Sequence, residues 1–131
     1  MRVLVVDDDQ TSLTFVRLVL GRCGHEVLTR DSAIGTTAVI LKERPDVVLL
    51  DVHMPALKGG DLVQQIRKST ARRDARVVVL LFSALDEAAL ASERAQSGAD
   101  GALVKTADPN KFVRDFDAVV AHARAALRFT T

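Results

Sequence analysis

The sequence contains little of what marks a disulfide-bonded, membrane-spanning or nucleic-acid-binding protein. Its one cysteine, Cys23, cannot form an internal disulfide and indicates a reducing compartment. The 18 Lys and Arg residues against 17 Asp and Glu leave a formal net charge of +1, which gives no general attraction to nucleic acid or to an anionic membrane. We see no secretory leader pattern, and apolar runs such as 77–82 are far shorter than the roughly 20 residues that span a bilayer. We therefore expect a cytoplasmic protein that binds neither a membrane nor nucleic acid directly.

The one local concentration of basic residues is segment 67–76, which holds Arg67, Lys68, Arg72, Arg73 and Arg76. Charge runs in connecting segments are usually solvated, and no aromatic residue interleaves here to stack on a base. This segment therefore does not change the expectation that nucleic acid is not a partner.

What the sequence does contain is the composition of a folded globule. Of the 131 residues, 48% are hydrophobic and 27% are charged, a balance typical of soluble domains rather than disordered chains. This length suits one hydrophobic core and is short for two enzymatic lobes. We expect residues 1–131 to form a single domain.

Short apolar runs alternate with longer stretches of helical periodicity. The runs, predicted as strands, are Val3–Val6, a weaker one at Val27–Leu28, Val47–Leu50, Val77–Phe82 and Ala102–Val104. The stretches predicted as helices are Thr11–Arg22, Ala33–Glu43, Gly60–Lys68, Asp86–Ser97 and Pro109–Leu127. Because the runs show no polar alternation, we expect strands covered by helices on both faces. The pattern predicts an α/β fold with a five-stranded, doubly wound parallel sheet.

Three carboxylates follow two of the predicted strands. Asp7 and Asp8 come directly after the first strand, and Asp51 comes directly after the third. In an open α/β sheet, ligands bind outside the carboxyl ends of the strands, so the three acids converge if these strands are neighbours. Clustered carboxylates repel unless a cation balances them, and Mg²⁺ prefers oxygen ligands of this kind.

A hydroxyl and an ammonium group are predicted at the same sheet edge. Ser83 follows the fourth strand and Lys105 follows the fifth. Cations neutralise phosphoryl oxygens and a carboxylate can attack phosphorus, so this set of groups suits phosphoryl transfer.

At these positions the sequence resembles the receiver domains of two-component response regulators, those of chemotaxis regulators in particular. The matching segments are Val5-Val6-Asp7-Asp8, Leu50-Asp51-Val52-His53-Met54-Pro55 with Gly59, Phe82-Ser83-Ala84, and Gly98-Ala99-Asp100-Gly101-Ala102-Leu103-Val104-Lys105. The resemblance covers the chain from Arg2 to about Leu127. It implies a flavodoxin-like three-layer sandwich with strand order 2-1-3-4-5.

The resemblance also implies a metal-dependent reaction. Asp51 would be the nucleophile that takes a phosphoryl group from a phosphohistidine of a histidine kinase or phosphotransfer protein. Asp8 and Asp51 would bind Mg²⁺ directly, Asp7 directly or through water, and the backbone carbonyl of His53 would add a further ligand. The chain would thus catalyse its own phosphorylation and dephosphorylation while acting mainly as a switch.

Signalling is implied to follow from groups around the phosphoryl site. Ser83 would hydrogen-bond one phosphoryl oxygen and Lys105 would pair with another. The resulting shift would bias the surface of Asp86–Ser97, Ala102–Val104 and Pro109–Leu127, where the resemblance also allows a homodimer. The downstream protein target is not identified by the sequence.

Two positions depart from the family pattern. Thr106 stands where a proline usually follows the lysine with a cis bond, and a non-proline cis bond costs about 3 kcal/mol, so we expect a trans bond. This leaves the aim of Lys105 open. Ala102 stands where many members carry a switching aromatic residue, so we expect output through backbone shifts or another surface.

Alternative interpretations remain open beside this one. A pseudo-receiver would keep the fold as an interaction module without phosphorylation, whereas a haloacid-dehalogenase-like phosphatase is disfavoured because no second acid stands two residues after Asp51. Asp9 and Asp61 are interpreted as turn or helix-capping residues.

Overall fold

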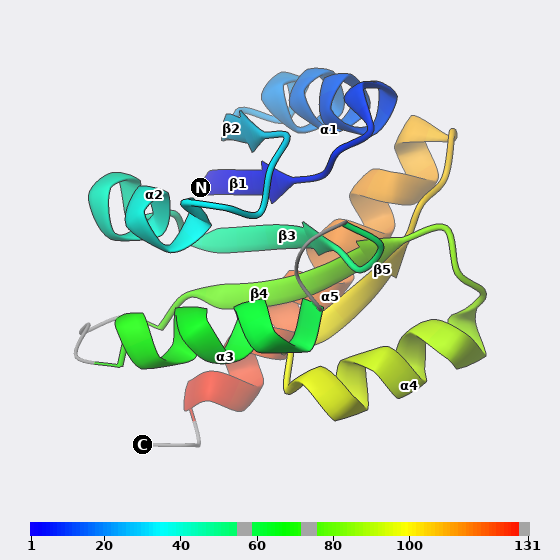
Figure 1. The fold of residues 1–131 in the computed structure, drawn as a ribbon. Helices are drawn as coiled ribbons and strands as arrows, with labels where there is room; N and C mark the ends of the chain where they lie inside the picture. The colour runs from blue at the N-terminus through cyan, green and yellow to red at the C-terminus, as the bar shows by residue number, and fades with distance from the viewer. Residues whose placement is uncertain (55–58, 72–75, 129–131) are drawn as a thin grey trace.

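The computed structural model describes residues 1–54, 59–71 and 76–128. Strands and helices alternate strictly along the chain (Figure 1). In order they are β1 (Arg2–Val6), α1 (Gln10–Arg22), β2 (Glu26–Arg30), α2 (Thr36–Glu43), β3 (Val47–Asp51), α3 (Gly59–Ser69), β4 (Val78–Ser83), α4 (Glu87–Ser97), β5 (Gly101–Val104) and α5 (Pro109–Arg128). The α/β alternation predicted from the apolar runs is confirmed.

The five strands form one parallel sheet in the order β2-β1-β3-β4-β5. Strand β1 lies between β2 and β3. In the pairing of β1 with β3, Val6 lies beside Leu50. The strand order therefore reverses between β1 and β3, which is the point where open α/β sheets bind ligands. The predicted order 2-1-3-4-5 is confirmed.

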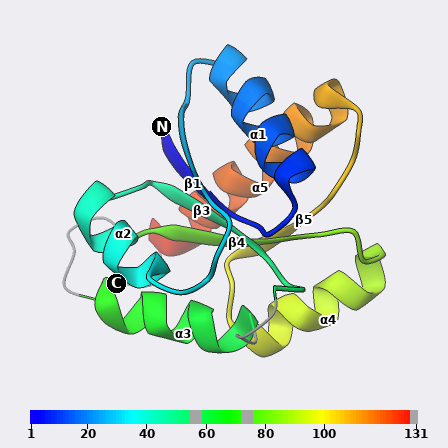
Figure 2. The same cartoon turned by 45° about the horizontal axis from the view of Figure 1, so that its top comes forward.

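Helices cover both faces of the sheet, as Figures 1 and 2 show. Alternate residues of β1 serve opposite faces: Val5 packs with the α1 and α5 side, and Leu4 packs with the α2, α3 and α4 side. Both of these side chains are fully buried. This two-sided burial is the reason that the strands read as continuous apolar runs.

Helix α2 begins later than the sequence predicts, at Thr36 rather than Ala33. Gly35 precedes it in the left-handed region, at φ 79°, and a residue there cannot belong to a right-handed helix. Ile34 is consequently placed in the connecting segment, where its side chain is 70% exposed.

Asp9 and Asp61, the two acids interpreted as turn or helix-capping residues, lie at the starts of helices. The Asp9 carboxylate caps α1, accepting from the Thr11 N–H at 3.1 Å and from the Ser12 hydroxyl at 2.9 Å. These hydrogen bonds lower the pKa of Asp9 below its ordinary value. Asp61 lies in the first turn of α3. The interpretation of Asp9 as a capping residue is confirmed.

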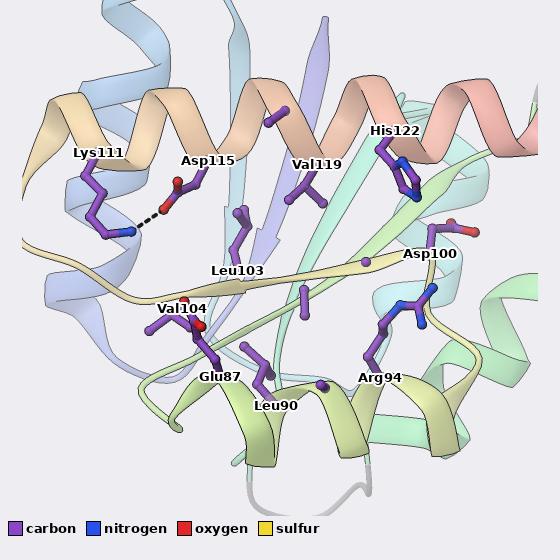
Figure 3. Close-up of a pocket in the computed structure, with 14 residues that line it drawn as sticks. Glu87, Leu90, Arg94, Asp100, Leu103, Val104, Lys111, Asp115, Val119 and His122 are labelled. Atoms are coloured by element: carbon purple, nitrogen blue, oxygen red, sulfur yellow. Dashed lines mark hydrogen bonds and ion pairs between the residues drawn. The ribbon is translucent and has the colours of Figure 1, made fainter.

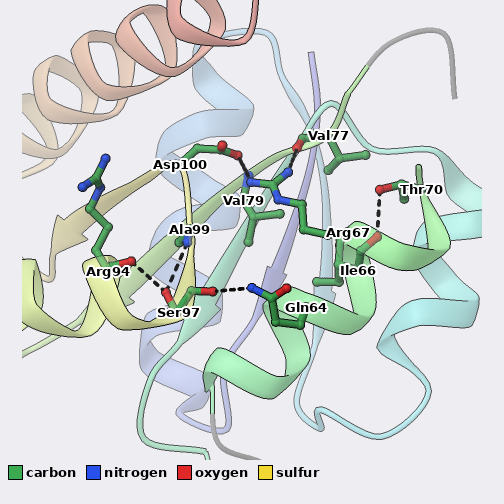
Figure 4. A network of polar contacts seen from close by, with 10 residues as sticks. All are labelled: Gln64, Ile66, Arg67, Thr70, Val77, Val79, Arg94, Ser97, Ala99 and Asp100. Atoms are coloured by element: carbon green, nitrogen blue, oxygen red, sulfur yellow. Dashed lines mark hydrogen bonds and ion pairs between the residues drawn. The ribbon is translucent and has the colours of Figure 1, made fainter. Parts of the chain in front are cut away.

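A polar network ties α3 to the connection between α4 and β5 (Figure 4). The Arg67 guanidinium pairs with the Asp100 carboxylate, which also accepts from the Val79 N–H at 2.8 Å. Beside it, the Gln64 amide donates to the Ser97 carbonyl at 3.0 Å. Arg67 and Asp100 therefore have a structural role, and this role explains the presence of one basic residue in the segment 67–76.

Some of the predictions concern residues outside the described ranges. These are Pro55 of the third-strand motif and residues 72–75 of the basic segment. Within the described ranges, no helix combines the length and the apolar character that a membrane crossing needs.

Candidate functional site

Three carboxylates converge where β1 and β3 end. Asp7 and Asp8 directly follow β1, and Asp51 is the last residue of β3, the neighbouring strand. One oxygen from each of the three lies within 4.8 Å of the others. Asp7 and Asp51 are buried and Asp8 is exposed, so the cluster opens to solvent on one side.

The fold fixes Asp7 through both its backbone and its side chain. Its N–H donates to the Arg30 carbonyl at 3.0 Å, which extends the β1–β2 ladder by one residue, and its Oδ1 accepts from the Asp9 N–H at 2.9 Å. The buried Oδ2 accepts no hydrogen bond of regular geometry from the described residues, although the Lys105 Nζ lies 2.7 Å away. Asp7 thus turns one carboxylate oxygen into the site, where the Lys105 ammonium balances its charge.

Asp51 is held in an environment that disfavours its charge. Burial raises the pKa of its carboxyl above the ordinary value, the His53 N–H at 3.1 Å acts in the opposite direction, and the Asp7 carboxylate raises it further. The Lys105 ammonium, 3.9 Å from Asp51 Oδ2, offsets only part of this. A second cation would relieve the remaining repulsion.

Lys105 points into the acidic cluster from the end of β5. Its peptide bond to Thr106 is trans, as is every other bond in the described part of the chain, which confirms that prediction. The ammonium lies between Asp7 and Asp51 and 5.4 Å from the centre of the Phe82 ring, a cation–π distance. The structure therefore places this lysine at the site with a trans peptide bond to Thr106.

Ser83 ends β4 at the same edge of the sheet. Phe82, the residue before it, is the register partner of Asp51 on β3. Ser83 is fully buried, its hydroxyl oxygen accepts from the Leu85 N–H at 3.1 Å, and its carbonyl accepts from the Lys105 N–H at 2.6 Å. Ser83 and Lys105 are thus joined through the backbone.

Two further features concern His53 and Phe82. The imidazole of His53 is exposed, and only its backbone N–H is seen to contact Asp51, so a role for its carbonyl stays a prediction. The sequence predicts Phe82 only as the last residue of a strand, and its position beside the lysine is not predicted. Nothing in an apolar run marks which ring lies near a cation.

The oxygen donors of this cluster fit a hard divalent cation. Mg²⁺ takes one or two carboxylates with water to complete an octahedron, and carboxylate oxygens of Asp7, Asp8 and Asp51 face one another here. The buried Asp7 Oδ2 has capacity for such a ligand. The Lys105 ammonium already supplies one positive charge, so the metal would be the second.

Comparison with known proteins agrees with this geometry. A model of the response regulator receiver domain matches residues 3–117. The chain belongs to this family. Receiver domains serve two-component systems, in which they take phosphoryl groups from histidine kinases, and they bind Mg²⁺ at an acidic pocket.

Relatives of this receiver domain differ in overall length. Protein PilH of Pseudomonas aeruginosa is 29% identical over 120 residues, covering 92% of this chain and 98% of PilH. The sensory/regulatory protein RpfC of Xanthomonas campestris is 35% identical over 107 residues, but these are 80% of this chain and only 14% of RpfC. The probable transcriptional regulator ycf27 of Guillardia theta is 32% identical over 98% of this chain and 46% of its own length.

A solved structure shows the same fold. The chemotaxis response regulator CheY4 of Vibrio cholerae superposes with a TM-score of 0.77 at 28% identity, covering 90% of this chain and 97% of that one. The flavodoxin-like sandwich expected from the sequence is thereby confirmed.

Proposed function

We propose that Asp51 accepts a phosphoryl group from a phosphohistidine, carried by a histidine kinase or a phosphotransfer protein, in a Mg²⁺-dependent reaction. The observation that carries this proposal is the meeting of three carboxylates and one ammonium group at the switch point of the sheet. Membership of the receiver family supports it.

The transfer step is a displacement at phosphorus. An Asp51 carboxylate oxygen forms the new P–O bond while the donor P–N bond breaks, and the electron pair of that bond returns to the imidazole nitrogen. The product is an acyl phosphate, which water later hydrolyses to restore the carboxylate. Bound by Asp7, Asp8, Asp51 and the His53 carbonyl, Mg²⁺ would neutralise charge on the phosphoryl oxygens.

Lys105 and Ser83 would bind oxygens of the phosphoryl group once Asp51 carries it. The ammonium rests beside Asp7 at 2.7 Å and needs only to exchange one anionic partner for another. The Ser83 hydroxyl, buried at the end of β4, would donate to a second phosphoryl oxygen. Their backbone link would pass the displacement on to β5.

The whole of residues 1–131 would act as one receiver domain that signals by a conformational change at the surface of α4, β5 and α5. Its output would go to a downstream protein or to a second copy bound at that surface, with neither nucleic acid nor a membrane as a direct partner. Ala102 has no rotamer to switch, so the change would be carried by backbone shifts.

Intact mass spectrometry after incubation with Mg²⁺ and acetyl phosphate tests the proposal. The native chain should gain one phosphoryl group and Asp51→Asn should gain none. Asp9→Asn, which changes an exposed acid outside the cluster, is the matched control and should be labelled like the native chain. A folded native chain that takes no phosphoryl group from acetyl phosphate or from a cognate kinase would contradict it.

A further inference from the structure

The Lys105 side chain lies on the same face of the sheet as Phe82. Side chains of β5 alternate between the two faces, with Leu103 on the α5 side and Val104 on the α4 side (Figure 3). The Lys105 N–H donates to the Ser83 carbonyl, which continues the β4–β5 ladder by one residue and returns Lys105 to the α5 side. Phe82 is the register partner of Leu103, so its ring lies within reach of the lysine stem.

The Phe82 ring is held in place by other aromatic rings. It is buried, and its centroid lies 5.8 Å from that of Phe112 on α5. Phe112 in turn packs against Phe15 of α1 at 5.4 Å and against Phe116 at 6.1 Å between centroids. Because core side chains are close-packed, helices α1 and α5 leave the Phe82 ring little room to turn.

The Lys105 ammonium has two kinds of partner. Its Nζ lies 2.7 Å from Asp7 Oδ2 and 3.9 Å from Asp51 Oδ2. It also lies over the Phe82 ring, 5.4 Å from the centroid, and the face of an aromatic ring attracts a cation. The charge of the carboxylates changes when a metal binds or when Asp51 is modified, whereas the ring stays the same.

The aim of Lys105 depends on side-chain contacts rather than on an unusual peptide bond. The bond to Thr106 is trans, and the four-carbon stem of a lysine is flexible. The side chain is also 20% exposed, so water competes for the ammonium. A partner fixed in the core therefore limits the positions that the ammonium can take.

We propose that Phe82 is a positioning residue, whose ring keeps the Lys105 ammonium at the acidic cluster while the charges of its anionic partners change. The inference rests on the proposed phosphorylation of Asp51, because the positioned ammonium then meets an oxygen of the phosphoryl group. Phe82 itself touches neither the phosphoryl group nor the metal and acts through the lysine alone. Its removal should therefore slow phosphoryl transfer only where the ammonium is present.

Proton NMR of the unphosphorylated, metal-free chain tests the contact itself. Protons over the face of an aromatic ring are shielded by its ring current, so the methylene protons beside the Lys105 ammonium should resonate upfield of those of Lys42, which is exposed. Lys105→Met assigns the signal by removing it. Phe82→Leu should return the signal to the position of an exposed lysine, whereas Phe116→Leu, an equal truncation in the same core, should leave it shifted.

Labelling rates with Mg²⁺ and acetyl phosphate test the consequence for the reaction. Phe82→Leu and Phe82→Met, which both lack a ring at this position, should take up the phosphoryl group about threefold to tenfold more slowly than the native chain. Phe116→Leu should be labelled at the native rate, although it also loses a buried ring. In Lys105→Met, which has no ammonium to position, adding Phe82→Leu should slow labelling no further.

Any of three results would overturn the inference. The first is a native chain whose Lys105 methylene protons resonate where those of an exposed lysine do. The second is an equal labelling rate in Phe82→Leu and Phe116→Leu, and the third is a further loss of rate when Phe82→Leu is added to Lys105→Met. Urea denaturation checks that each variant is folded.

Failure of the proposed phosphorylation gives a different pattern. A native chain that is never labelled at Asp51, but shows the ring-shifted lysine signal and loses it in Phe82→Leu, would remove the phosphorylation and retain Phe82 as the residue that positions the ammonium. A native chain that is labelled, but lacks the shifted signal, would retain the phosphorylation and remove this role of Phe82.

Discussion

The negative charge of Asp51 destabilises the folded chain. Burial and the Asp7 carboxylate raise its pKa, so the folded state binds the proton more tightly than the unfolded state. The stability that this provides is complete below the unfolded pKa, near 3.8, and is lost as the pH rises through the folded value. Without metal, the ionised carboxylate therefore destabilises the fold at neutral pH.

Asp51→Asn should accordingly be more stable than the native chain at pH 7 in chelator, because the amide keeps an acceptor for the His53 N–H without the charge. The gain should shrink towards pH 4. Urea denaturation at both pH values measures it. If Asp51→Asn were no more stable than the native chain at either pH, the repulsion between the Asp51 and Asp7 carboxylates would already be neutralised in the native chain.

His25 is the second residue whose ionisation affects stability. It is half-buried, with its ring against Phe116 at 5.8 Å between centroids, and burial lowers its pKa. A lowered histidine pKa gives stability that is present above the unfolded value, 6.5, and is lost as the pH falls, because the unfolded chain takes up the proton first.

His25→Gln should therefore flatten the loss of stability between pH 7 and pH 5. Melting temperatures across that interval test this, with His122→Gln on the exposed side of α5 as control. A loss of stability in His25→Gln as steep as in the native chain would assign the acid sensitivity to other groups.

Helix α5 and strand β5 pack closely at Gly101, where there is no room for a larger side chain. A Cβ built on Gly101 would lie 2.6 Å from Val119 Cγ1 and 3.0 Å from Leu80 Cδ2. Gly101→Ala should thus push α5 outward and cost about 1–3 kcal/mol of unfolding free energy. Chemical denaturation checks the cost, and Val119→Ala in the same chain should restore part of it. Additive losses in the double variant would mean that the two sites are independent.

Helix α1 depends on one capping side chain. Asp9→Ala removes the acceptor for the Thr11 N–H and the Ser12 hydroxyl, and should cost about 1 kcal/mol. Asp9→Ser, which keeps a capping oxygen, should recover most of that cost in the same denaturation experiment. Equal losses of unfolding free energy in both variants would show that the effect does not come from the capping hydrogen bonds.

The elements also show how far sequence reasoning reaches. Strands could be predicted because both faces of the sheet are buried, and the acids at their ends could be paired once the strand order was known. The start of α2 could not be predicted, because it depends on the left-handed backbone at Gly35. Nor could the pairing of Lys105 with Asp7 be predicted, because it depends on where the ammonium lies relative to Asp7, Asp51 and the Phe82 ring in the folded chain.

At the scale of the whole molecule, metal binding and stability should be linked. A cation that binds the acidic cluster only in the folded state stabilises it by about 1.4 kcal/mol at ten times its Kd. Mg²⁺ should therefore raise the melting temperature of the native chain, and a chelator should reverse this. The rise should be much smaller in Asp51→Asn and unchanged in Asp9→Asn. Equal rises in all three chains would place the bound metal elsewhere.

The hydrogen bond from the Lys105 N–H to the Ser83 carbonyl, at 2.6 Å, makes the ends of β4 and β5 one mechanical unit. Because the bond fixes the backbones of Ser83 and Lys105 relative to each other, we expect the hydroxyl and the ammonium to approach an incoming anion together. Capture of the anion should thus be a single kinetic event with one rate constant, even though its two contacts come from different strands. For the same reason we expect the anion to leave both residues in one step, so that the lifetime of the bound state depends on Ser83 and Lys105 together.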